Sequence, residues 1–125
     1  GIFCAEWDDK TDYLGDYYVC GLNGWYDDKS GIEGYKAGLG DFCGMSETAY
    51  KYKAGEEIEF TFGSINGHCF MLADGKLVAQ HLDGILKLNK GHIGFSPYCT
   101  MLRIRDIVIR EISYVNNQQH YNPEF

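Results

Sequence analysis

Residues 56–79 read EEIEFTFGSINGHCFMLADGKLVA, and much of the fold can be inferred from them. From Glu57 to Phe62, polar residues alternate with large apolar ones, the period of two that a half-buried strand shows. Two dipeptides then tolerate the positive φ angles of a two-residue hairpin turn, Asn66-Gly67 and Asp74-Gly75. Because these turns lie eight residues apart, the stretch predicts three antiparallel strands in a meander, with Cys69 and Met71 on one face of the middle strand.

Further strands are predicted on both sides of this meander. They cover residues 17–20, 34–39, 92–95 and 101–112. In the last of them the apolar parity changes between Ile104 and Ile107, which predicts a β-bulge near Asp106. Gly84 disfavours a helix in the apolar stretch that follows the meander, so we expect a loop with a short strand at residues 85–88.

The composition also indicates an all-β chain. A length of 125 residues fits one domain, and 16 Gly and 10 Tyr against 2 Pro are typical of short strands joined by tight turns. About six to eight such strands predict a sandwich or a barrel. We assign residues 1–115 to a single domain and residues 116–125 to a polar C-terminal tail.

The charge distribution excludes some classes of partner. The formal net charge is −7, so the chain repels phosphate backbones and we expect no nucleic-acid binding. All three arginines lie within eight residues and alternate with isoleucines, which is typical of the solvated face of a strand: Arg103, Arg105 and Arg110. No apolar run approaches the ~20 residues of a membrane span.

The five cysteines stand singly, without a C-x-x-C pair, which argues against a zinc ribbon or a thioredoxin-type site. Since five is odd, at least one thiol has no partner within the chain. Cys69 and Cys99 lie in apolar strand patterns, where a thiol packs as a small apolar group. Free buried thiols are the favoured prediction, and one or two disulfide bonds remain an alternative.

Four stretches together resemble a known family. They are residues 55–62 (GEEIEFTF), 70–78 (FMLADGKLV), 91–95 (GHIGF) and 102–112 (LRIRDIVIREI). Over about residues 54–112 their order is similar to concanavalin A-like jelly rolls of the laminin-G and bacterial glucan-processing kind. The resemblance implies a two-sheet antiparallel β-sandwich and an extracellular or cell-surface location. Members of this family include carbohydrate-binding modules, lectins, glycoside hydrolases and polysaccharide lyases, so the fold alone does not fix the function.

The chain is shorter than typical members of that family and opens on Gly1 rather than on Met. We therefore expect a reduced domain, or one from which a preceding segment with an initial strand was removed. A missing strand leaves an open sheet edge, and such an edge predicts a protein partner or self-assembly as an alternative function.

Two stretches fit a glycan site, in which aromatic faces pack on sugar rings and nearby acids accept hydrogen bonds from hydroxyls. One is the turn that contains Trp25, Tyr26 and Asp27, and the other contains Trp7 and Tyr13. The alternative is that each tryptophan covers the core and the acids only solvate a turn.

The same N-terminal stretch carries acids that could bind Ca²⁺, namely Asp8, Asp9 and Asp12, with Asp16 nearby. Related jelly rolls often hold this ion. The spacing does not match an EF-hand loop, so a solvated acidic surface is the favoured alternative.

No pair of catalytic groups stands out. The E-x-D-x-x-E pattern that hydrolases of this fold commonly carry is absent, and Glu57 and Glu59 are expected to face solvent. The four histidines are scattered without adjacent partners: His68, His81, His92 and His120. The sequence thus favours a non-catalytic carbohydrate-binding domain, with an assembly or adhesion module, or a fragment of a jelly-roll hydrolase or lyase, as alternatives.

Overall fold

The computed structural model describes residues 1–25, 29–37 and 41–113, and within them the chain is all-β. Of residue 25 and residues 41–47 the backbone alone is described. The strands are β1 (Ile2–Ala5), β2 (Trp7–Asp8), β3 (Tyr13–Leu14), β4 (Tyr17–Trp25), β5 (Lys29–Lys36), β6 (Asp41–Thr48), β7 (Phe60–Ile65), β8 (His68–Ala73), β9 (Lys76–Leu82) and β10 (His92–Gly94). Over these same ranges, no helix has the length and apolar character needed to cross a bilayer.

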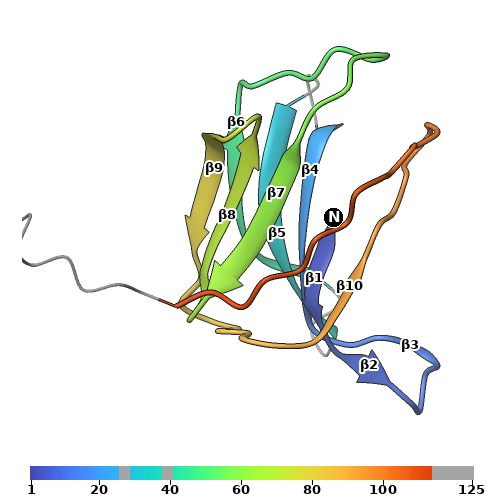
Figure 1. Cartoon of the computed structure of the whole chain (residues 1–125). Coiled ribbons are helices and arrows are strands. Elements are labelled where there is room, and N and C mark those ends of the chain that lie inside the picture. The colour runs from blue at the N-terminus through green and yellow to red at the C-terminus, as the bar shows by residue number, and fades with distance from the viewer. Residues whose placement is uncertain (26–28, 38–40, 114–125) are drawn as a thin grey trace, which may run out of the picture.

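The strands form antiparallel sheets in two main layers (Figure 1). One sheet has the order β10-β1-β4-β5-β6, and the other is the meander β7-β8-β9. The meander lies over β5 and β6, because β9 contacts both of these strands and β8 contacts β5. A separate two-stranded hairpin, β2–β3, projects from the end of the five-stranded sheet where β4 begins. This arrangement is compatible with a β-sandwich.

The meander predicted from the sequence is confirmed. Its two turns lie at the predicted dipeptides, where Asn66 and Asp74 have φ angles of 49° and 50° and the glycines that follow them 82° and 76°. Cys69 and Met71 are fully buried on one face of β8, as the alternation predicted.

Side chains from both sheets meet in one core. The five-stranded sheet contributes Phe3, Tyr18, Cys20 and Ile32, and the meander contributes Cys69, Met71 and Ala79. Tilted ring contacts extend this core, since the Phe3 ring centroid lies 5.4 Å from that of Tyr18 and 5.3 Å from that of Phe62. The aromatic residues therefore join the two layers by packing.

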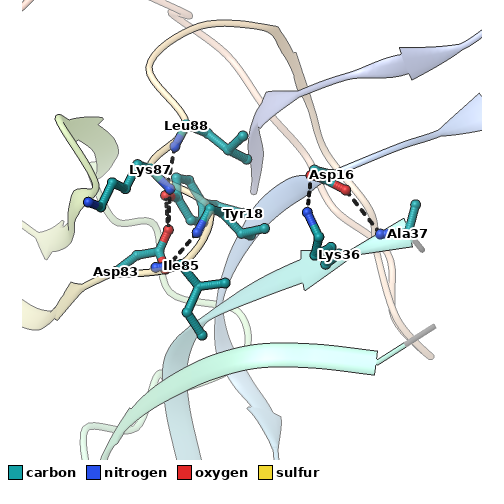
Figure 2. Close-up of polar contacts among 9 residues, drawn as sticks. Asp16, Tyr18, Lys36, Ala37, Asp83, Ile85, Lys87 and Leu88 are labelled. Atoms are coloured by element: carbon teal, nitrogen blue, oxygen red, sulfur yellow. Dashed lines mark hydrogen bonds and ion pairs between the residues drawn. The ribbon is translucent and has the colours of Figure 1, made fainter. Parts of the chain in front are cut away.

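A buried pair of polar side chains also joins the two layers (Figure 2). The hydroxyl of Tyr18, on β4, donates a hydrogen bond to Oδ2 of Asp83 at 2.5 Å, and it accepts one from the backbone N–H of Leu88 at 3.0 Å. The Asp83 carboxylate also accepts backbone hydrogen bonds from three consecutive residues: Ile85 at 2.8 Å, Leu86 at 3.2 Å and Lys87 at 2.7 Å. We call Tyr18, Asp83 and the loop 85–88 the clasp.

The clasp explains why one predicted strand is absent. Residues 85–88 form a loop without the short strand that we expected. Their N–H groups are bonded to side chains of the clasp, so they cannot join a sheet ladder.

The strand predicted at residues 101–112 is wrong as well. The chain from Phe95 to Ser113 contains no strand, and every side chain from residue 95 to 113 is exposed. At the predicted bulge, Asp106 has a φ angle of 56°, which interrupts an extended backbone instead of bulging a paired one. Cys99, expected to pack in this region, is exposed for the same reason.

Near the N-terminus the two other predicted strands are present with different limits. The strand at residues 17–20 continues to Trp25 as β4, and the strand predicted at 34–39 begins earlier, at Lys29, and ends at Lys36. Residues 38–40 and the tail from residue 114 lie outside the described residues.

Replacing Gly67 by alanine should destabilise the protein more than replacing Gly75 by alanine. Both glycines have positive φ angles, but a Cβ at Gly67 would lie 2.7 Å from the Asp83 carbonyl oxygen, whereas Gly75 has open space. We expect Gly75→Ala to cost about 1 kcal/mol and Gly67→Ala roughly 2 kcal/mol more, measured by urea unfolding. Equal costs for the two variants would contradict the close contact at Gly67.

Removing the Tyr18 hydroxyl should lower the free energy of unfolding by about 2–4 kcal/mol, because it leaves a buried carboxylate and the Leu88 N–H without their partner. The matched control is Tyr98→Phe, at a side chain that is 81% exposed, where the change should stay below about 0.5 kcal/mol. Urea unfolding of both variants measures the difference.

Asp83 should make the free energy of unfolding depend on pH in the acid range. Burial by itself raises the pKa of this carboxyl, but the hydrogen bonds from Tyr18 and from three backbone N–H groups outweigh burial and hold the pKa below 3.8. Its contribution is therefore complete above pH 3.8 and is lost as the pH falls through the lower, folded-state pKa. Between about pH 5 and pH 2, the unfolding free energy of Asp83→Asn should fall less than that of the wild type. Equal slopes would contradict this role.

Candidate functional site

The β2–β3 hairpin is tied to the start of β4 by backbone hydrogen bonds. The N–H of Gly15 donates to the carbonyl oxygen of Glu6 at 2.8 Å, and the N–H of Glu6 donates to that of Asp16 at 2.9 Å. Gly15 is buried, and a Cβ at this position would lie 3.2 Å from the Cβ of Glu6. A small residue is therefore needed where the hairpin meets the sheet.

An open hollow of about 400 Å³ lies beside this hairpin. It is lined by β2, by the turn that follows it and by the segments next to β4 and β5: Glu6, Trp7, Asp8, Asp9, Lys10, Gly15, Asp16 and Ala37. Trp7 is 49% exposed and is one of the residues that line the hollow. Four acidic residues and one lysine line it, and Lys36 lies beside one of the acids, so negative charge still prevails around the hollow.

Two of these acids are held in place by the backbone. Oδ1 of Asp8 accepts the N–H of Lys10 at 2.9 Å, which fixes the hairpin turn. Oδ1 of Asp16 accepts the N–H of Ala37 at 3.1 Å, and its Oδ2 lies 3.5 Å from Nζ of Lys36 (Figure 2). Because each carboxylate has further acceptor capacity, both can still accept hydrogen bonds from a ligand.

Tyr13, predicted together with Trp7, lies on the other side of the hairpin. Trp7 pairs with Leu14 and Asp8 pairs with Tyr13, and successive residues of a strand point to opposite faces. Tyr13 is 63% exposed. Trp7, Asp8 and Asp9 all line the hollow, whereas Tyr13 does not. By the same alternation, the side chain of Asp8 shares the face of Tyr13 and not that of Trp7.

Two aromatic residues that the sequence reasoning did not single out lie near Tyr13. Tyr17 and Tyr35 pair across β4 and β5, and their rings stack with centroids 5.0 Å apart. Burial raises the pKa of the Tyr17 hydroxyl, and the neighbouring groups of Tyr13, Tyr35 and Glu33 raise it further. Strand alternation was the available signal, since the buried Tyr18 requires Tyr17 to face away from the core.

The second predicted aromatic site lies at the other end of the sheet. Trp25 is the last residue of β4 and pairs with Lys29, while Tyr26 and Asp27 lie outside the described residues. Trp25 is eight residues along β4 from Tyr17, which is roughly 25 Å at the rise of an extended strand. Because β2 adjoins the start of β4 (Figure 1), Trp7 and Trp25 cannot contact the same sugar ring.

The acids predicted to bind Ca²⁺ all belong to the hairpin. Asp8 belongs to β2, and Asp9 and Asp12 lie in the turn, where Asp12 has a φ angle of 54°. In the part of the chain that the structure describes, no three acidic, histidine or cysteine side chains come together as a metal site. Calcium binding thus stays a prediction from the sequence.

The two glutamates considered for catalysis face solvent, as expected. Glu57 forms an ion pair with Arg105, and the backbone N–H of Glu59 donates to Oδ1 of Asp74 at 2.9 Å. Among the histidines, Nε2 of His68 lies 3.0 Å from Oε1 of Gln80 across β8 and β9. These contacts place neither glutamate in the hollow at Trp7.

Comparisons with known proteins found no matching protein-family model, no similar curated protein and no similar solved structure. The chemistry of the site therefore follows from its own residues.

The thiols of the described residues should react at very different rates. Cys4, Cys20, Cys69 and Cys99 are all free. Burial raises the pKa of Cys20 to about 11 and that of Cys69 to about 12, whereas Cys99 is exposed. In the native protein at about pH 8, iodoacetamide should therefore modify Cys99 first, and Cys20 and Cys69 only after unfolding. Peptide mass spectrometry with and without urea measures this order, and rapid native labelling of Cys69 would contradict it.

Proposed function

We propose that this chain is a non-catalytic carbohydrate-binding domain and that the hollow beside Trp7 receives the sugar. The observation that carries the proposal is a half-exposed tryptophan, Trp7, beside a hollow lined with acidic residues. The flat apolar face of tryptophan matches the C–H face of a pyranose, and carboxylate oxygens accept hydrogen bonds from sugar hydroxyls. The tryptophan and the acidic residues belong to the β2–β3 hairpin and to the segments that join it to the sheet.

The charge of the hollow restricts the class of glycan. Glu6, Asp8, Asp9 and Asp16 outnumber the ammonium of Lys10, so an anionic sugar would be repelled. A neutral hexose fits this environment, and an amino sugar would add a favourable charge. The same repulsion disfavours the lyase alternative, whose uronate substrate needs a positive site.

The proposed fold family agrees with this function. We infer a concanavalin A-like jelly roll from the two stacked antiparallel sheets together with the resemblance of residues 54–112. An extracellular or cell-surface location is part of the same proposal, because domains of this kind meet their glycans outside the cell. No contact of Glu57 or Glu59 favours the glycosidase alternative.

Replacing Trp7 should abolish most of the binding. Trp7→Ala removes the apolar platform, and we expect at least a tenfold rise in Kd for neutral oligosaccharides, about 1.4 kcal/mol or more. Calorimetry with soluble β-glucan and chitin oligosaccharides, and with alginate oligosaccharides as anionic contrast, measures both affinity and charge preference. The matched control is Tyr98→Ala, which removes an aromatic ring that is 81% exposed and lies outside the hollow.

Intrinsic fluorescence separates the two candidate aromatic sites. The chain has 2 Trp, so a Trp25→Phe variant reports on Trp7 alone. A saturable shift in this variant supports the hollow, whereas a shift that survives in Trp7→Phe and is absent from Trp25→Phe assigns the glycan to the far end of β4. Absence of binding to every neutral and amino-sugar ligand would contradict the proposed function.

A further inference from the structure

The segment 101–112 exposes an unusual amount of apolar surface. Its apolar side chains have exposed fractions between 44% and 94%, and they are Met101, Leu102, Ile104, Ile107, Val108, Ile109 and Ile112. Monomeric proteins rarely leave so many large apolar side chains together in solvent, and such surfaces mark contacts with partners. This segment is therefore the strongest candidate for a protein interface.

Within one chain, the segment makes contacts without becoming a strand. It runs beside β7, the edge strand of the meander (Figure 1). Arg105 forms an ion pair with Glu57, and Cδ1 of Ile112 approaches the position that a Cβ on Gly63 would take, at 3.3 Å. No ladder joins the segment to β7 in the described structure, and the apolar side chains between these two contacts stay exposed. The chain's own sheet edge does not cover them.

The order of residues in this segment is self-complementary when two copies run antiparallel. With Val108 opposite Val108 of a second copy, Ile107 faces Ile109 and Ile104 faces Ile112. The charged residues match in the same register, since Asp106 faces Arg110 and Arg105 faces Glu111. Directly opposed side chains are the unit of sheet stabilisation, so every opposed pair from residue 104 to residue 112 is favourable.

Neighbouring registers lose this match. Moving the centre from Val108 to Ile107 places Ile104 opposite Arg110 and Asp106 opposite Val108. If the axis lies between Ile107 and Val108, Arg105 faces Arg110 of the second copy. Like charges, or a charge facing an apolar side chain, are unfavourable in these positions. The charge pattern therefore selects one register.

We propose that two copies of this chain associate through an antiparallel β-ribbon formed by residues 104–112, with a two-fold axis at Val108. The interface is isologous, because the same surface of both copies forms it. Asp106 must leave its positive φ angle for an extended one, and aspartate adopts either conformation at modest cost. Arg105, which pairs with both Glu57 and Asp106 of its own chain, then pairs with Glu111 of the second copy, and Asp106 pairs with Arg110 of that copy.

The test is a charge exchange within the pair Asp106 and Arg110, followed by sedimentation velocity of the full chain from about 1 µM to 1 mM. In a two-fold ribbon, residue 106 of each copy faces residue 110 of the other, so this pair occurs twice. Asp106→Arg alone therefore creates two arginine–arginine pairs, and Arg110→Asp alone creates two aspartate–aspartate pairs. Each single variant should raise the dimer Kd at least about tenfold. The double variant restores both pairs and should return the Kd to within about threefold of the wild type.

A matched control is Arg103→Asp, which makes the same charge change as Arg110→Asp but lies opposite Ser113, outside the matched pairs. It should leave the dimer Kd unchanged. All of these positions are exposed, so near-ultraviolet circular dichroism should show an intact fold in every variant. The proposal is overturned if the wild type stays monomeric over the whole series, if the double variant fails to restore the dimer, or if Arg103→Asp weakens it as much as Arg110→Asp.

Discussion

The hydrogen bond between the Tyr18 hydroxyl and the Asp83 carboxylate is the contact on which most of the described structure depends. The two residues are 65 positions apart in sequence, and they join the first layer, at β4, to the end of β9 in the second. A buried carboxylate is costly unless its lone pairs are satisfied, and three backbone N–H groups complete the set. Because Leu86 and Leu88 pack on the core from this loop, the polar clasp and the apolar core support each other.

The clasp also positions the candidate glycan site, although it does not touch it. Because Tyr18 faces the core, Tyr17 faces outward. Asp16, just before β4, contacts Lys36 and Ala37 at the end of the sheet. The same strand end receives the hairpin through Gly15 and Glu6. The Trp7 hollow is thus built where a locked strand begins, which gives a surface site a rigid support.

The features that the sequence predicted correctly are local ones. The alternation of residue types and the two turn dipeptides are enough to predict the whole meander. The burial of Cys69 and Met71 follows from the same period of two. The clasp could not be predicted, because nothing near Asp83 indicates that a tyrosine 65 residues earlier will bind it. Trp7, Asp8 and Asp9 line one hollow, but the separation of Trp7 from Tyr13 depends on the register of the hairpin, which a sequence does not reveal.

The absence of the strand predicted at residues 101–112 has a physical reason. Apolar residues interspersed with charged ones favour an extended segment that pairs with another strand, but they do not specify which chain supplies that strand. In the described chain no strand pairs with this segment, and its sequence is complementary to a second copy of itself. A dimer of that kind would carry two Trp7 hollows on one particle. Since an exposed indole and a few carboxylates give only modest affinity for one sugar, two linked hollows would raise the effective concentration on a polysaccharide without any new contact. Ribbon pairing and glycan binding would then act together, although they use different residues.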